Sequence, residues 1–210
     1  MTHKVLLLGA TGTAGTAIRQ ALLTKTDATL TLVARHTDQL TPVPGRETVQ
    51  PLDVHDQDAL AKVMDSQTIV LSALSAEGSQ DELAHLAQDI VQTMQNKSVT
   101  RLIFMVAMGI YNEIPASVGS QDNVNQNPGQ IHNLKAAQVV ENSPLDYTLL
   151  RPGFLISGPE PVIITHKGEP VSGNTTSLSS LGVVATRLVT GELKASRESL
   201  GLNQPPISRN

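Results

Sequence analysis

The stretch that decides the fold is Gly9-Ala10-Thr11-Gly12-Thr13-Ala14-Gly15, which directly follows the apolar run Lys4–Leu8 (KVLLL). An apolar run of this length closed by a glycine is typical of a buried strand, and helix-compatible apolar spacing follows at Ile18, Leu22 and Leu23. Between a strand and a helix, the first glycine permits a tight turn, the second lets the backbone approach a pyrophosphate and the third allows close helix–strand packing. The phosphate would lie at the helix N-terminus, where unpaired N–H groups favour an anion. The alternative is a tight turn that needs glycines only for its own backbone.

The rest of the chain continues the alternation of strand and helix. Strands are predicted at 4–8, 29–34, 47–54, 68–73, 101–108 and 146–150, and helices at 16–24, 56–65, 80–96 and 130–142. Six strands with helices between them predict an α/β fold, a doubly wound parallel sheet of the Rossmann type, in a single domain over residues 1–210. The residues after about 154, with a strand at 162–165 and a helix at 178–193, are expected to form a small C-terminal appendage on the substrate side.

Composition excludes several classes of protein. The chain of 210 residues has no cysteine, so disulfide frameworks and thiolate metal sites are excluded, and its six histidines show no metal-ligand spacing. The formal net charge is −4 with scattered basic residues, which argues against a nucleic-acid or anionic-membrane surface. The longest apolar run, 102–110, is too short to span a bilayer, and the N-terminus lacks a signal-peptide pattern. We expect a cytoplasmic monomer or homodimer without a metal.

The end of the second predicted strand bears on the choice of nucleotide. Domains that select NAD usually carry a carboxylate there, which bonds the ribose hydroxyls. Here the sequence reads Val33-Ala34-Arg35-His36, and the first carboxylate is Asp38. A carboxylate would repel a 2′-phosphate, whereas the Arg35 guanidinium can donate two charge-assisted hydrogen bonds to it. The sequence therefore favours NADP (NADPH) over NAD. The alternative is an exposed arginine that merely ends a strand.

Four segments together resemble a known family. They are GATGTAG at 9–15 after KVLLL, Arg35 at the end of a strand, LDV at 52–54 and DYTLLRPG at 146–153. With these the chain resembles the atypical short-chain dehydrogenases, and more narrowly their NAD(P)-binding, NmrA-like group with its flavin and biliverdin reductase relatives. The resemblance covers essentially the whole chain, but its motifs do not specify a substrate.

The resemblance implies further contacts with the cofactor. Asp53 would sit beside the adenine amino group, with a helix-capping role as the alternative, and Ala73 and Leu74 would pass beneath the ribose and nicotinamide. Arg151-Pro152-Gly153-Phe154 would frame the other side of the pocket. The full set of expected cofactor-binding residues is Gly9, Thr11, Gly12, Thr13, Gly15, Arg35, Asp53, Val54, Ala73, Leu74, Ala107 and Pro152.

The catalytic apparatus of typical short-chain dehydrogenases is not repeated in the sequence. Those enzymes use a serine and a Tyr-x-x-x-Lys pair, in which the lysine lowers the pKa of the tyrosine. Here the strand end reads Met105-Val106-Ala107-Met108-Gly109, and Ile131 stands four residues before Lys135. Tyr111 and His132 are the candidate proton donors, with packing and solvated roles as the alternatives.

A hydride transfer to a flavin or quinone needs mainly stacked and oriented rings. The polar stretch 112–129 is expected to be functional or mobile and to help roof the pocket. The sequence thus indicates an NAD(P)H-dependent oxidoreductase that reduces a small planar acceptor. The alternative is a non-catalytic, redox-sensing NADP-binding regulator of the NmrA-like type; a sugar-nucleotide epimerase or dehydratase fits less well without Tyr-x-x-x-Lys.

Overall fold

The computed structural model describes residues 2–64, 69–75, 81–158 and 161–204. The main strands are β1 (Lys4–Leu8), β2 (Thr29–Ala34), β3 (Glu47–Pro51), β4 (Ile69–Ser72), β5 (Arg101–Met105), β6 (Asp146–Pro152), β8 (Ile163–Thr165) and β10 (Glu198–Asn203). The helices are α1 (Thr13–Lys25), α2 (Gln57–Met64), α3 (Glu82–Asn96), α4 (Ile131–Glu141) and α5 (Leu178–Thr190), with 3-10 turns at Ser120–Asp122 and Pro128–Gln130. Two short strands, β7 (Phe154–Ile156) and β9 (Thr175–Ser177), pair in parallel as a separate small sheet.

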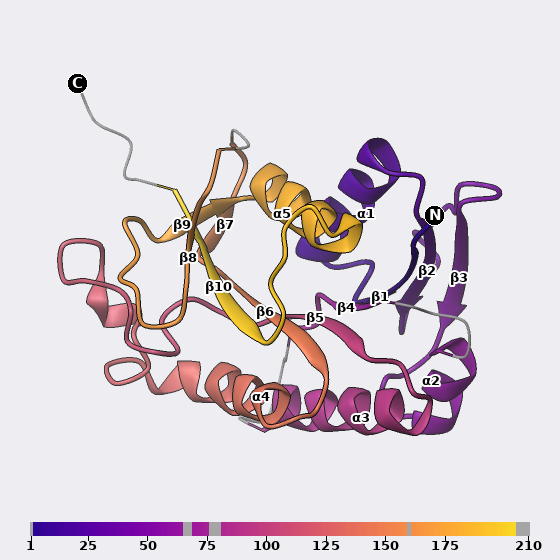
Figure 1. Cartoon of the computed structure of the whole chain (residues 1–210), viewed down its shortest axis with the longest axis horizontal. Coiled ribbons are helices and arrows are strands. Elements are labelled where there is room, and N and C mark those ends of the chain that lie inside the picture. The colour runs from indigo at the N-terminus through magenta and orange to yellow at the C-terminus, as the bar shows by residue number, and fades with distance from the viewer. Residues whose placement is uncertain (1, 65–68, 76–80, 159–160, 205–210) are drawn as a thin grey trace.

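The main sheet has eight strands in the order β3-β2-β1-β4-β5-β6-β10-β8. Every neighbouring pair is parallel except β10 with β8, which is antiparallel. Figure 1 shows α1 and α5 on one face of this sheet and α2, α3 and α4 on the other. The predicted doubly wound Rossmann-type fold is therefore confirmed.

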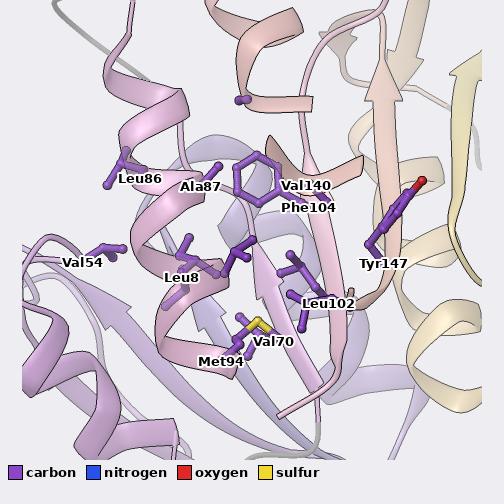
Figure 2. Close-up of a cluster of buried hydrophobic side chains, with 14 of the residues drawn as sticks. Leu8, Val54, Val70, Leu86, Ala87, Met94, Leu102, Phe104, Val140 and Tyr147 are labelled. Carbon is purple, nitrogen blue, oxygen red and sulfur yellow. The ribbon is translucent and has the colours of Figure 1, made fainter. Parts of the chain in front are cut away.

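Two apolar cores hold the layers together, one on each face of the sheet. Leu6 and Leu8 of β1 belong to the core under α3 and α4, while Val5 and Leu7 belong to the core under α1 and α5. This division follows from the two-residue period of a strand. Figure 2 shows the first of these cores, where Leu8 lies near the α3 side chains. Because both faces are covered, the strands can be apolar almost throughout.

The C-terminal residues contribute more to the main sheet than the sequence indicates. β10, which no prediction includes, pairs with β6 over five residues and extends the sheet beyond it. Its sequence, ESLGLN, interrupts the apolar residues with serine, glycine and asparagine, so it carries a weak strand signal. Two predicted strands are shorter than expected, since β3 ends at Pro51 and β5 at Met105. No helix in the described part of the chain is long and apolar enough to cross a bilayer.

Candidate functional site

A cleft lies where the order of the strands reverses. The chain runs from β1 outward through β2 to β3 and then returns to β4 on the other side of β1. In open α/β sheets this reversal leaves a crevice beyond the carboxyl ends of the strands. We call it the switch-point cleft; its volume is about 280 Å³. It is lined by Gly9, Thr11, Gly12, Val33, Ala34, Arg35, Leu52, Asp53, Val54, His55, Ala73, Leu74, Ser75, Glu82 and Leu86.

The three glycines of the loop differ in what the fold demands of them. Gly9 has φ +79°, and a Cβ there would lie 2.9 Å from the Ala73 carbonyl oxygen. A Cβ on Gly15 would lie only 2.1 Å from the Gly9 carbonyl oxygen. Gly12, by contrast, is exposed with φ −71°, and its Cβ would make an ordinary 3.5 Å contact with that oxygen. The fold therefore requires glycine at positions 9 and 15. At Gly12 the fold would accept a side chain, so the glycine there leaves open space at the protein surface.

The N-terminus of α1 opens directly at this loop. Gly12 is its N-cap, no side chain caps the first turn, and that turn contains no acidic residue. Such an end presents unpaired N–H groups and a positive dipole, which together favour an anion. Thr11 and Thr13 are exposed beside it, although Thr13 lines a groove between α1 and α5 instead of the cleft. Gly15 is buried beneath the loop and lines neither.

Arg35 and Asp53 follow β2 and β3 and both line the cleft. Arg35 is exposed, and no other described residue forms an ion pair or hydrogen bond with it. Asp53 Oδ1 accepts the backbone N–H of His55 at 3.0 Å, which closes a local turn. The cap of α2 is Asp56, whose Oδ1 accepts the Ala59 N–H at 2.9 Å. Asp53 is thus a turn residue with a carboxylate in the cleft, not the helix cap considered as its alternative role.

Two further residues that are expected to contact the cofactor, Val54 and Ala73, line the cleft and are buried. Val54 is 5% exposed and belongs to the core shown in Figure 2. Ala73 is 6% exposed and its N–H donates to Leu8 O, which holds the strand end against β1. His55, Glu82 and Leu86 also line this cleft, and no pattern in the sequence predicts them there.

A second pocket of about 110 Å³ lies beyond β5 and β6. Only β4 separates β5 from β1, and neighbouring strands lie about 5 Å apart. The second pocket therefore lies close to the switch-point cleft. Its lining includes the expected residues Ala107 and Pro152. The complete set is Ala107, Met108, Ile114, Asp122, Gln130, Pro152, Gly153, Phe154 and Asn174.

The long polar loop forms one wall of the second pocket through an extensive hydrogen-bond network. Asn123, 4% exposed, accepts the Ile114 N–H at 3.0 Å and donates to its carbonyl at 2.8 Å. Gly109, at φ +94°, lies so close to the loop that a Cβ would be 2.4 Å from the Asp122 carbonyl oxygen. The Val124 N–H donates to Gly109 O at 2.9 Å. These contacts fix Ile114 and Asp122 in the wall of the pocket.

Arg151 fastens this loop to the sheet. Its fully buried guanidinium pairs with the Glu113 carboxylate and donates through Nε to Ser199 Oγ at 3.0 Å. The other oxygen of Glu113 accepts the Tyr111 N–H at 2.9 Å. Arg151 therefore does not line the second pocket itself, although the neighbouring Pro152, Gly153 and Phe154 do. It frames the pocket by tying the loop to β6 and β10.

Tyr111 and His132 line neither of these two cavities. The Tyr111 hydroxyl donates to Glu141 Oε1 at 2.7 Å, and Lys167 Nζ lies 4.3 Å from the ring centroid. Burial and then the bond to Glu141 raise the pKa of Tyr111 far above its ordinary value. His132 is half-buried in the first turn of α4, with Nε2 3.0 Å from Asn133 Nδ2. The geometry argues against both residues as proton donors and favours the packing role for Tyr111.

Lys135 also lines neither cavity, and its ammonium group forms an ion pair elsewhere. It pairs with Asp81 at the start of α3, and this pair lowers the pKa of the Asp81 carboxyl. Ile131, one turn before it on α4, lies where a Tyr-x-x-x-Lys pair would place the tyrosine. Among the described residues that line the second pocket, Asp122 is the sole ionisable residue.

Comparison with known proteins agrees with this geometry. A family model described as NAD(P)H-binding matches residues 9–192, which include the glycine loop, Arg35 and both cavities. The chain belongs to the NAD(P)H-binding family. The family is described by its binding of NAD(P)H, and the switch-point cleft lies within the matched residues. No curated protein matches the chain.

Solved structures extend the likeness over nearly the full length. A Rossmann-fold NAD(P)-binding family protein from Shigella flexneri is 28% identical, with 98% of this chain and 95% of that chain covered and a TM-score of 0.78. A short-chain dehydrogenase/reductase from Veillonella parvula, solved in complex with NADP, is 21% identical, with 98% and 96% covered and a TM-score of 0.84. An oxidoreductase from Lactococcus lactis is 18% identical, with 96% and 91% covered and a TM-score of 0.74. The last two likenesses concern the fold.

Proposed function

We propose that the chain is an NADPH-dependent reductase that transfers hydride to a small planar acceptor such as a flavin or a quinone. The observation that carries the proposal is the conjunction of Gly12 and Arg35 in one cleft. Gly12 leaves open space at a helix N-terminus without a side-chain cap, and Arg35, whose guanidinium has no partner among the described residues, lines the same cleft. The first feature suits a pyrophosphate and the second suits a 2′-phosphate.

The preference for NADPH over NADH rests on Arg35. It is exposed and lines the cleft at the end of β2, where an acid would serve the ribose hydroxyls of NAD. Arg19, Arg46 and Arg151 instead bond to carboxylate or carbonyl groups inside the protein. Since the Arg35 guanidinium has no partner among the described residues, it is available for a phosphate. The structure from Veillonella parvula, which contains NADP, is similar in fold.

The second pocket suits the acceptor. A dinucleotide with its pyrophosphate at Gly12 would extend across β4 and bring the nicotinamide to the ends of β5 and β6. Met108 and Ile114 make the pocket apolar, and Phe154 is 59% exposed at its edge, where its ring can stack on a planar molecule. Transfer of a hydride between stacked rings depends mainly on their orientation and on the exclusion of water. The residues of this pocket can provide both.

A second candidate function is a non-catalytic, redox-sensing regulator of the NmrA-like type. The observation that favours it is the engagement of Tyr111 by Glu141 and of Lys135 by Asp81, which leaves neither side chain to protonate a substrate. Such a protein would discriminate between reduced and oxidised cofactor without turning either over.

Turnover distinguishes the two functions. Loss of NADPH absorbance is followed with flavin mononucleotide and with a soluble quinone as acceptors, beside a titration of NADPH binding. The reductase oxidises NADPH with at least one acceptor, and Phe154→Ala lowers that rate while NADPH affinity stays within about twofold, since Phe154 lines the second pocket and not the switch-point cleft. Tight NADPH binding with no turnover by either acceptor would support the regulator, and no binding of NADPH would contradict both.

A further inference from the structure

His55 makes two ion-pair contacts at the edge of the switch-point cleft. Its Nδ1 lies 2.7 Å from Asp89 Oδ2, and its Nε2 lies 3.1 Å from Glu82 Oε1. Both carboxylates belong to α3. Glu82 lies 27 residues and Asp89 lies 34 residues farther along the chain than His55. Gln57 Nε2 adds a 2.6 Å bond to the other oxygen of Asp89. The segment after β3 is therefore joined side by side to α3, and we call this the His55 bridge.

The bridge fixes the protonation state of His55. Ionised carboxylates only accept hydrogen bonds, so both ring nitrogens must donate and the ring must be an imidazolium. The bonds to Asp89 and then to Glu82 raise the pKa of His55 above its ordinary value. The other charged groups on the elements around it are Asp53 and Asp56 on its own segment, Asp58 and Lys62 on α2, and His85 on α3. The carboxylates outnumber the basic groups here, which favours the charged form of His55.

The bridge is continuous with the lining of the cleft. His55, Glu82 and Asp53 all line it, and the His55 backbone N–H holds Asp53 Oδ1 at 3.0 Å. Breaking the bridge would free the turn that aims the Asp53 carboxylate and would leave Glu82 unneutralised in a cleft that receives a polyanion. The described residues contain no group of three His, Asp or Glu that could hold a metal ion, so the cluster is an ion-pair bridge, not a cation site.

We propose that His55 is a positioning residue for the dinucleotide, because its imidazolium ties the Asp53 turn to α3 and neutralises Glu82 at the adenine end of the cleft. Cofactor affinity is then linked to the charge of His55. It is highest while the ring is protonated and falls as the pH rises through the pKa of His55. The inference rests on dinucleotide binding by this cleft and is independent of the acceptor.

The test is the pH profile of cofactor affinity, measured by nicotinamide fluorescence from pH 6.5, the ordinary pKa of histidine, upward. The chain has no tryptophan, so protein emission interferes little. NADH is titrated beside NADPH because it lacks the 2′-phosphate, which itself titrates near pH 6. His55→Gln is expected to weaken binding of both by roughly threefold to tenfold at the low end and to flatten the profile, since glutamine carries no titrating charge.

His166→Gln is the matched control. His166 forms a comparable ion pair, with Nδ1 2.9 Å from Glu198 Oε2, but it lies away from the cleft. Its profile should coincide with that of the wild type. Asp89→Asn is the second variant, because Asp89 does not line the cleft and, within the part of the chain that the structure describes, its side chain bonds only to His55 and Gln57. It should move the midpoint of the profile to lower pH, which a merely structural role would not do.

Two results overturn the inference. One is a His55→Gln profile that coincides with the wild type, and the other is an Asp89→Asn midpoint that does not move. If His55→Gln fails to fold, Asp89→Asn alone decides. A wild-type protein that binds neither NADPH nor NADH would overturn the inference together with the proposed function, whereas binding with an unchanged profile would overturn only the inference.

Discussion

Replacing Gly12 with alanine should separate cofactor binding from folding. The new methyl group would lie 3.5 Å from the Gly9 carbonyl oxygen, an ordinary contact, and the backbone at φ −71° and ψ 164° suits any residue. Alanine is a poorer helix N-cap than glycine, which costs roughly 0.5–1 kcal/mol. The free energy of unfolding should therefore fall by no more than about 1 kcal/mol.

The effect of Gly12→Ala on cofactor binding should be much larger. The methyl group would occupy the space through which a pyrophosphate approaches the uncapped N-terminus of α1. Losing one charge-assisted hydrogen bond from a backbone N–H costs roughly 1.5–3 kcal/mol. With displacement of the anion from the helix dipole, a loss of about 2–3 kcal/mol corresponds to a dissociation constant raised roughly 30- to 150-fold.

Two companion variants make the comparison decisive. Gly15→Ala would place a Cβ 2.1 Å from the Gly9 carbonyl oxygen and should destabilise the whole fold. Gly191→Ala, at φ +74° with no atom within 4 Å of the new Cβ, should cost roughly 1–2 kcal/mol of stability and leave NADPH affinity unchanged. Thermal unfolding and NADPH titration are measured on each. If Gly12→Ala folds and binds NADPH within twofold of the wild type, the assignment of the pyrophosphate to this loop is wrong.

Three further predictions concern stability. Arg151→Met leaves the Glu113 carboxylate buried without its partner and should cost roughly 3–5 kcal/mol in urea unfolding; a loss below about 1 kcal/mol would contradict the structural role of the pair. Burial would raise the pKa of Glu47, but hydrogen bonds, chiefly from Arg19, outweigh it and lower the pKa overall. This pair therefore stabilises the fold above the ordinary pKa of 4.5, and the contribution is lost as the pH falls through the folded-state pKa, so Glu47→Gln should flatten the acid limb of a thermal-unfolding profile. Gly182→Val would force a side chain between α5 and α1, where even a Cβ would be 2.7 Å from the Ala21 Cβ, and should lower stability by about 1–3 kcal/mol; unchanged unfolding would argue against the tight contact.

The sequence predicts those parts of the cleft that are encoded locally. The spacing of Gly9, Gly12 and Gly15 between a strand and a helix indicates the phosphate loop, because each glycine acts on its near neighbours in the chain. Arg35 and Asp53 are found for the same reason, since each follows a strand and parallel strands end at one edge of the sheet. The structure places all of these residues except Gly15 in the lining of the cleft.

The parts that the sequence does not predict depend on contacts between distant residues. The partners in the His55 bridge are 27 and 34 residues apart in the sequence, and Arg151 and Glu113 are 38 residues apart. No local sequence pattern therefore predicts either interaction. Tyr111 shows the same limit. Its place just after β5 suggested a proton donor, whereas Glu141 from the end of α4 engages its hydroxyl. The sequence does not predict β10, because its polar residues weaken the strand pattern and because the residues it pairs with on β6 lie about 50 positions earlier in the chain.

The measurement that tests the central claim most directly is the ratio of NADPH to NADH affinity in the wild type and in Arg35→Ala. The guanidinium has no partner among the described residues, so its removal should leave the fold and NADH binding nearly unchanged. A charge-assisted pair with the 2′-phosphate contributes roughly 1.5–3 kcal/mol, so the wild type should prefer NADPH by roughly tenfold to 150-fold and the variant should lose most of that preference. A ratio that is the same in both proteins would contradict the assignment of Arg35 and, with it, the case for NADPH as the cofactor.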